Sequence, residues 1–354
     1  MVKVGVIGCG KIAITRHLPE YASNPDAEIA GVYDFNLERA KEVAEQYQTR
    51  AYESVEEMLN DPQIEAVSVC VRNSDHSKVT VDALRAGKHV LCEKPMAVSL
   101  DECKEMVKIA EKTGKKLMVG HNQRFNRTHM KAKELIQNGA IGKVLSFKTT
   151  FGHGGPETWT VDKNNVWFFD KRFSAFGAMA DLGVHKTDLL IFLLETKVKK
   201  VTAVLKTLDK KDAEGNLINV DDNAICIYEM ENGAVGTMTA SWTYYGEEDN
   251  STIIYGSEGI LKIYDDPNYS IVRIGKDGTK IYYELDKMQT NDNQTKSGII
   301  DSWVAAIKND TVPEVNGKDA LDAMKAIFAA LESSESGQTV EITCLLYTSD
   351  AADD

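Results

Sequence analysis

Along the first 120 residues, short runs that are apolar throughout alternate with longer segments in which apolar residues recur every three or four positions. The run at residues 66–71 has the composition of a strand buried on both faces, as in parallel sheets. Residues 100–113 show the helical period, and Gly114 directly after them is a common helix end. This alternation predicts an α/β fold with a doubly wound parallel sheet. The predicted strands are residues 2–7, 27–33, 66–71, 89–92 and 116–120, and the predicted helices are residues 11–22, 37–47, 55–59, 78–86 and 100–113.

The pattern changes after about residue 123, where long segments alternate apolar and polar residues. Asn232-Gly233 lies between two such segments and predicts a hairpin turn. Residues 275–278 predict another such turn. A second α/β domain with a large open, mainly antiparallel sheet is expected, and its open face needs a cover such as a second copy of the chain. We expect one domain at residues 1–122 and another at residues 123–343. Its predicted helices are residues 128–138, 177–194 and 317–334, and its predicted strands are residues 201–208, 223–230, 234–242 and 251–255.

The length and charge narrow the classes of function. A chain of 354 residues suits two domains better than one. The formal net charge of −13 argues against a nucleic-acid partner, because neutralising phosphates requires a basic face. A neutral polyol or sugar fits this charge better than an acidic substrate. No apolar run approaches the roughly 18 residues of a membrane span, so no membrane partner is expected.

The cysteines and the first residues suggest where the protein works. The six cysteines include no C-x-x-C pair, and most lie in apolar runs, which is typical of reduced, buried thiols. Residues 2–7 already have a strand pattern, so we expect no signal peptide. A cytoplasmic location follows as an expectation.

The last residues, 344–354, resemble translated adaptor sequence from DNA library preparation. We expect this tail to be non-native, so that its deletion leaves folding and activity intact. An ordinary frayed terminus is the alternative.

A glycine-rich turn follows the first predicted strand. Gly8, Gly10 and Ala13 form the pattern G-x-G-x-x-A between a strand and a helix, and Asp34 ends the next strand. In this setting the glycines let a pyrophosphate approach the backbone, and Asp34 accepts hydrogen bonds from the adenosine ribose. The carboxylate would repel a 2′-phosphate, so NAD is favoured over NADP. A glycine turn without a ligand is the alternative.

Two further segments carry candidate chemistry. Lys94 follows the strand at residues 89–92, so it lies at the carboxyl edge of the sheet, where a cation can stabilise a forming alkoxide. Asp181, His185 and Asp188 are spaced to share one face of a regular helix. A histidine titrates near neutrality and suits the role of a base that removes a hydroxyl proton. A surface lysine and a capped helix start with an incidental histidine are the alternatives, and no ligand cluster indicates a metal.

These motifs occur together and in this order in a known family, which the chain resembles over residues 2–343. It is the glucose–fructose oxidoreductase, inositol dehydrogenase and rhizopine catabolism family (Gfo/Idh/MocA). The resemblance implies an N-terminal Rossmann domain that binds NAD and a substrate domain whose sheet often forms a homodimer or homotetramer. It implies Lys94, Asp181 and His185 as the catalytic set, with His185 as the proton acceptor. It also implies cofactor contacts from Gly8, Gly10, Lys11, Ile12, Asp34, Asn73, His76, Glu93 and Lys94.

One residue pair departs from the family pattern. The family has Thr-Pro before the Asn-x-x-His that Asn73 and His76 match, whereas this chain has Val71-Arg72. Arg72 either contacts cofactor or substrate or points to solvent, and the sequence favours neither. Residues 152–172 are expected to form a substrate loop, with aromatic rings that suit a sugar or that belong to the core. The residues expected to bind substrate are Lys94, His121, Arg124, Trp167, Asp181, His185 and Asp188, with a role in joining the domains as the alternative for His121 and Arg124.

The expected activity is hydride transfer between NAD and a secondary hydroxyl or ketone of a sugar, glycoside or inositol. Two alternatives stay open. Some relatives use a tightly held NAD transiently to cleave glycosidic bonds, and regulatory relatives only sense a sugar or NAD. The presence of Lys94, Asp181 and His185 together argues against a sensor, because a sensor needs no base.

Overall fold

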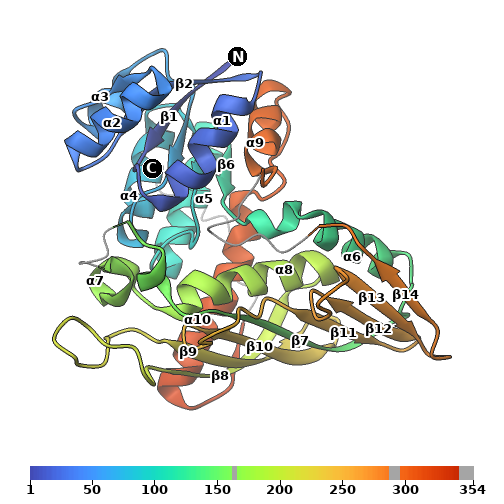
Figure 1. The fold of residues 1–354 in the computed structure, drawn as a ribbon. Helices are drawn as coiled ribbons and strands as arrows, with labels where there is room; N and C mark the ends of the chain where they lie inside the picture. The colour runs from blue at the N-terminus through green and yellow to red at the C-terminus, as the bar shows by residue number, and fades with distance from the viewer. Residues whose placement is uncertain (162–165, 287–295, 343–354) are drawn as a thin grey trace, which may run out of the picture.

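The computed structural model describes residues 1–161, 166–286 and 296–342 of the chain and contains two sheets (Figure 1). The predicted tail at residues 344–354 lies outside the described residues. The first sheet has six parallel strands in the order β3-β2-β1-β4-β5-β6, which confirms the expected doubly wound topology. Its strands are β1 (Val2–Ile7), β2 (Ala27–Tyr33), β3 (Arg50–Ala51), β4 (Ala66–Val69), β5 (His89–Cys92) and β6 (Leu117–Val119).

Helices begin where short polar side chains can cap them. Ser54, Ser99 and Asn36 each accept a hydrogen bond from a backbone N–H in the first turn of the helix that follows. Gly114 ends one of these helices in the left-handed conformation at φ 66°, as its position in the sequence predicts. The helices of this part are α1 (Leu18–Ser23), α2 (Leu37–Tyr47), α3 (Val55–Asn60), α4 (His76–Arg85) and α5 (Leu100–Thr113).

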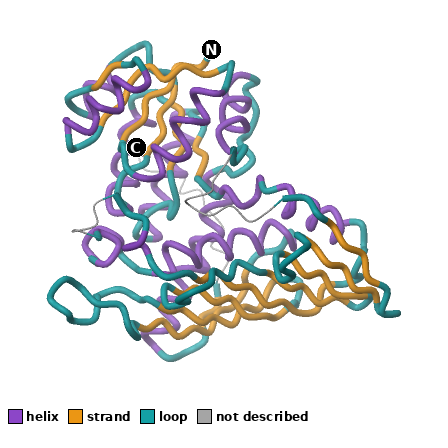
Figure 2. The backbone as a smooth tube through the Cα atoms, in the orientation of Figure 1, coloured by secondary structure: helices purple, strands orange, loops and turns teal. Residues whose placement is uncertain are grey.

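The second sheet has nine strands in the order β14-β13-β12-β11-β7-β10-β9-β8-β15. Neighbouring strands are antiparallel except β7 and β10, so the sheet is mixed but mainly antiparallel, as expected. Figure 2 shows helices on the side of this sheet that faces the first domain. Its strands are β7 (Val144–Gly152), β8 (Val198–Lys206), β9 (Asn223–Met230), β10 (Val235–Ser241), β11 (Thr252–Gly256), β12 (Gly259–Ile263), β13 (Ile271–Gly275), β14 (Lys280–Tyr283) and β15 (Val340–Glu341). The helices in this later part of the sequence are α6 (Arg127–Gln137), α7 (Lys171–Ser174), α8 (Val184–Leu194), α9 (Ile299–Lys308) and α10 (Gly317–Ser336).

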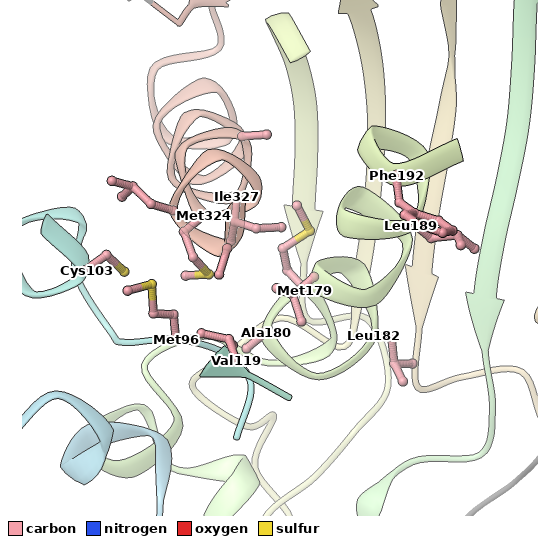
Figure 3. Close-up of a cluster of buried hydrophobic side chains, with 14 of the residues drawn as sticks. Met96, Cys103, Val119, Met179, Ala180, Leu182, Leu189, Phe192, Met324 and Ile327 are labelled. Carbon is pink, nitrogen blue, oxygen red and sulfur yellow. The ribbon is translucent and has the colours of Figure 1, made fainter. Parts of the chain in front are cut away.

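The core is continuous between the two parts of the chain. Figure 3 shows Met96 and Cys103 of the first part facing Met324 and Ile327 of α10, with Met179 close by. Helix α10 packs on α5, on α8 and on β8. This packing fixes the loop after β5 relative to the segment before α8, and those two segments carry the predicted reaction residues.

Helix α9 was not predicted from the sequence. Its residues Ile299, Trp303 and Val304 are buried together with Val4 and Tyr21 of the first sheet and of α1. A helix from late in the chain therefore completes the N-terminal core. The boundary between two domains at residues 122 and 123 stays a prediction. Helix α9 follows this boundary in the sequence but packs with the part of the chain that precedes it.

Two helices that were expected to be regular begin with a wide π-helical turn. Residues Ala13–His17 precede α1, where Pro19 lacks the N–H of a regular ladder. Residues Met179–Gly183 precede α8. The expectation of a regular helix over residues 177–194 is wrong at its start, because the backbone of residues Met179–Gly183 forms a wider π-helical turn. Asp181 lies within this wider turn.

No helix within the described residues is long and apolar enough to cross a membrane.

Candidate active site

A large cavity of about 1370 Å³ is lined by residues of both parts of the chain. It extends from the glycine turn after β1 to the start of α8. The structure brings every predicted cofactor and catalytic residue to this one cavity, together with Trp167, a further residue predicted to bind substrate. The predicted residues that line it are Gly8, Gly10, Lys11, Ile12, Asp34, Asn73, His76, Glu93, Lys94, Trp167, Asp181 and His185.

The glycine turn has the shape that a dinucleotide requires. Gly8 has φ 97°, and a Cβ there would come within 2.4 Å of the carbonyl oxygen of Cys70, so only glycine fits. A Cβ on Gly10 would meet nothing within 4 Å, so the backbone at this position is open to a ligand. The turn leads directly into the helix that begins with the π-helical segment. The residues present therefore fit a pyrophosphate group.

Asp34 lies beside this turn and is buried. One carboxylate oxygen accepts a hydrogen bond from the backbone N–H of Cys9 (2.8 Å), and the other from that of Asn36 (2.8 Å). Arg39 forms an ion pair with the same carboxylate at 3.2 Å. These contacts hold the carboxylate at the end of β2, where it meets the ribose in this architecture.

Lys94 and Asp181 form an ion pair inside the cavity. The Lys94 ammonium donates to Oδ1 of Asp181 at 2.8 Å and to its backbone carbonyl at 2.9 Å. Trp242 donates its indole N–H to Oδ2 at 3.1 Å. Burial opposes ionisation of Asp181, but the charge of Lys94 and these hydrogen bonds outweigh it and lower the pKa of the carboxyl group. Asp181 is therefore ionised, and it holds the Lys94 side chain at the cavity wall.

His185 lies one turn after Asp181 and lines the same cavity. His185 is 8% exposed, and its Nδ1 has no hydrogen-bond partner among the described residues. Burial, followed by the charge of Lys94, lowers the pKa of His185 well below its usual value. The imidazole is therefore neutral at pH 7 and able to accept a proton.

Glu93 holds the backbone of Lys94 in place through a hydrogen bond. It is buried, and its Oε1 lies 2.9 Å from Nε2 of His17 and 3.4 Å from Arg16, while its Oε2 accepts the backbone N–H of Lys94 at 3.1 Å. Burial raises the pKa of Glu93, but the hydrogen bond from His17 and the charge of Arg16 lower it to about 2. Arg16 and His17 were not predicted from the sequence. Both are buried residues of the π-helical turn, and such a turn does not follow the α-helical period of apolar residues.

Asn73 and His76 hold the neighbouring backbone. Asn73 donates its side-chain amide to the carbonyl of Ser174 at 3.1 Å, which joins the two parts of the chain. Nδ1 of His76 lies 2.7 Å from the carbonyl of Pro95, the residue after Lys94. Both residues line the cavity, and both position segments that border it.

His153 is a cavity residue that the sequence analysis placed only within a general substrate loop. Its Nδ1 accepts the backbone N–H of Gly155 at 2.9 Å, so the neutral ring carries its proton on Nε2. That Nε2 lies 3.9 Å from Oδ2 of Asp181. A hydrogen-bond donor therefore stands next to the Lys94–Asp181 pair.

Aromatic rings form another part of the cavity wall. Trp167 stacks on Phe168 with ring centroids 3.9 Å apart, and Trp159 meets Phe168 edge-on at 5.2 Å. All three line the cavity. Residues 162–165 of this predicted loop lie outside the described residues.

Three residues predicted to bind substrate do not line the cavity. Arg124 forms a bidentate ion pair with Asp188, with Nε–Oδ2 2.8 Å and Nη2–Oδ1 2.6 Å. His121 is buried, lies 4.0 Å from Asp188, and has its ring centroid 6.4 Å from that of His185. These contacts give Asp188 a structural partner in Arg124, and both residues belong to the second part of the chain.

A glycine turn with a buried carboxylate beside it, and a lysine–aspartate pair with a histidine, line one cavity and fit an NAD-dependent oxidoreductase. Two family models match the chain: an oxidoreductase family with an NAD-binding Rossmann fold over residues 2–121, and the GFO/IDH/MocA C-terminal domain over residues 129–262. The chain therefore belongs to the GFO/IDH/MocA family of oxidoreductases, and its cofactor is NAD.

Several characterised proteins are similar over nearly the whole length. The myo-inositol 2-dehydrogenase of Thermotoga maritima is 26% identical, over 96% of this chain and 98% of that protein. The glucose-6-phosphate 3-dehydrogenase of Bacillus subtilis is 27% identical, over 98% of this chain and all of that protein. A levoglucosan dehydrogenase in complex with NADH and levoglucosan has the same fold, with a TM-score of 0.85 at 24% identity, covering 96% of this chain and 99% of that one.

Proposed function

We propose that this enzyme transfers a hydride between NAD and a secondary hydroxyl or ketone of a sugar, glycoside or inositol. The observation that carries the proposal is the pair formed by Lys94 and Asp181 beside a neutral His185, in the same cavity as the glycine turn. Named dehydrogenases of an inositol and of a glucose phosphate among the relatives support this substrate class.

In this proposal Lys94 binds the reacting oxygen. Two of its three ammonium protons are donated to Asp181, and the third is directed to the substrate hydroxyl. The cation lowers the energy of the negative charge that develops on this oxygen. Asp181 fixes the position of the ammonium group, because the carboxylate is itself held by Trp242.

His185 receives the hydroxyl proton. Its neutral ring faces the cavity, and its lowered pKa favours release of that proton to solvent after turnover. NAD, when bound, supplies the nicotinamide carbon that accepts the hydride. In the reverse direction His185 donates the proton to the ketone oxygen.

The aromatic wall supports a sugar or cyclitol as the substrate. The apolar C–H face of such a ring packs on aromatic rings, while its hydroxyl groups need partners. Trp167 and Phe168 offer the first kind of contact, and Nε2 of His153 offers a donor. This combination suits a neutral ring with several hydroxyl groups.

The direct test measures NADH formation by absorbance at 340 nm with NAD and a panel of inositols, aldoses and glucosides. We expect turnover on a few members of the panel, lost in Lys94→Ala and kept in Lys104→Ala, whose lysine pairs with Asp101 on the surface of α5. Release of the aglycone without net NADH would instead indicate a glycosidase that recycles its cofactor. Binding of NAD and sugar without any turnover would indicate a sensor.

We also propose that two copies of the chain pair through the open face of the second sheet, as a homodimer or as part of a homotetramer. Val204 and Ile225 are neighbours in register on β8 and β9, and both are more than half exposed, with Ile227 close to them at 50%. An exposed apolar patch on a sheet face is typical of an interface. Light scattering should show an oligomer that Ile225→Lys together with Ile227→Lys converts to a monomer.

We propose a cytoplasmic location for the enzyme. The five described cysteines are buried free thiols, which suits a reducing compartment. Fractionation of cells that express the tagged protein tests this directly.

A further inference from the structure

Arg72, the residue that departs from the family pattern, lies close to two aromatic rings at the cavity. Its guanidinium carbon is 5.1 Å from the ring centroid of Phe35 and 4.3 Å from that of Phe173. Both distances are within the range of cation–π attraction. Arg72 and Phe35 line the cavity. The side chain therefore does not simply point to solvent.

The two rings belong to different parts of the chain. Phe35 follows β2 directly, next to Asp34, whereas Phe173 belongs to α7 in the second part. A second link lies beside the first, because the Asn73 amide donates to the carbonyl of Ser174 at 3.1 Å. Two consecutive residues after β4 are thus joined to two consecutive residues of α7, across one end of the cavity.

That end is the adenosine end. Asp34 marks the ribose position, and the cavity continues past it along α3 and α4, where Val55, Leu59 and Val79 line it. Apolar side chains suit the flat face of an adenine ring. Phe35 is 67% exposed, and its near neighbours are the guanidinium groups of Arg39 and Arg72. An exposed aromatic ring beside a ligand cavity indicates a surface that a bound group covers.

We propose that Arg72 stacks on the adenine ring of NAD and, held by Phe173, forms a strap that slows release of the cofactor. A guanidinium plane stacks well on heteroaromatic rings and keeps its charge at every physiological pH. Release of NAD would require Arg72 to leave Phe173, which separates the two parts of the chain at this point. The strap acts on how long the cofactor stays bound, while the reaction at Lys94 is at the opposite end.

The test measures the rate of NADH dissociation by stopped-flow fluorescence after mixing the complex with excess ADP-ribose. Arg72→Ala and Phe173→Ala should each raise this rate by about 5- to 30-fold, the range expected for loss of a partly desolvated cation–π contact. Arg172→Ala is the matched control. Arg172 also lies over the Phe173 ring, at 5.4 Å, but it pairs with Asp170 on the surface and does not line the cavity.

A second measurement locates the effect on the cofactor. Calorimetric titration should show that Arg72→Ala weakens ADP-ribose by a factor similar to that for NADH, and leaves nicotinamide mononucleotide unaffected. The melting temperature of each variant shows whether the fold is intact. Unchanged NADH dissociation in folded Arg72→Ala, or equal effects of Arg72→Ala and Arg172→Ala, would overturn the proposal.

Discussion

Two ion pairs flank His185 along the same helical run, and they differ in what surrounds them. Lys94–Asp181 lies at the cavity wall, with 15% of the lysine side chain exposed. The Lys94 ammonium lies on a flexible stem and has one more N–H donor than its two hydrogen bonds to Asp181 use. Arg124–Asp188 is a planar fork, 7% and 1% exposed, and neither residue lines the cavity. Of the two pairs, only Lys94–Asp181 lines the cavity, and the proposed reaction role therefore belongs to this pair.

The largest expected effect concerns the pair at the cavity. Lys94→Ala and His185→Ala should each lower kcat by roughly 10²- to 10⁴-fold, because one loses stabilisation of the developing negative charge and the other the proton acceptor. NADH formation under saturating substrate measures this. Circular dichroism and melting temperature should show an intact fold, and near-normal turnover in either folded variant would remove the residue from the mechanism.

The second prediction concerns the other pair. Asp188→Ala should destabilise the fold by about 3–5 kcal/mol, because it leaves the buried Arg124 charge without its main partner. Urea unfolding measures this loss. Asp319→Ala is the control, since Asp319 lies 3.8 Å from the same guanidinium but is 43% exposed, and it should cost about 1 kcal/mol or less. Equal losses in the two variants would show that burial of the fork contributes little.

A third ion pair, Asp34–Arg39, extends the comparison to the other end of the cavity. Asp34→Ala should raise the ratio of kcat/KM for NADP to that for NAD by roughly 10- to 100-fold, because a repelling carboxylate is lost while Arg39 remains. Steady-state kinetics with both cofactors tests it. An enzyme that already prefers NADP before the substitution would contradict the role given to Asp34.

The smallest expected effect concerns Lys186, which follows His185 but faces the sheet. Its ammonium donates to the carbonyl of Asn250 at 2.8 Å, and burial lowers the pKa of Lys186 to about 7. Between pH 7 and its unfolded pKa, the unfolded chain binds a proton that the folded chain lacks, so stability rises with pH. From pH 7.5 to 8.5 the free energy of unfolding should rise by about 1 kcal/mol relative to Lys186→Met. A difference independent of pH would contradict this.

Local pattern was enough to predict the first half of the fold. Strands Val2–Ile7 and His89–Cys92 and helices Leu37–Tyr47 and Leu100–Thr113 lie at the predicted residues, because each is a continuous apolar or periodic segment with polar or glycine ends. Lys94 could be placed at the cavity for the same reason, since it follows a buried parallel strand. Features that depend only on residues close together in the sequence can therefore be predicted from it.

The rest depends on contacts between distant segments. The wide turn that carries Asp181 interrupts the helical period, so its π-helical form could not be predicted from the spacing of the polar residues. Asp181 and His185 line the cavity, whereas Asp188 does not. The partnership of Arg124 with Asp188 joins residues 64 positions apart, and Arg72 meets Phe173 across 101 positions. Helix α9 packs on a sheet that begins almost 300 residues earlier. Such pairings are decided by packing, which no local pattern reports.

The most direct test of the contrast between the two ion pairs is a single-turnover measurement of NADH formation in Lys94→Ala and in Asp188→Asn. Both variants would be loaded with NAD, mixed with a substrate found in the panel, and studied at a temperature at which both are folded. We predict a loss of at least about 100-fold for Lys94→Ala and a rate within about tenfold of the unsubstituted enzyme for Asp188→Asn. A larger loss in Asp188→Asn than in Lys94→Ala would contradict the division between a reaction pair and a structural pair.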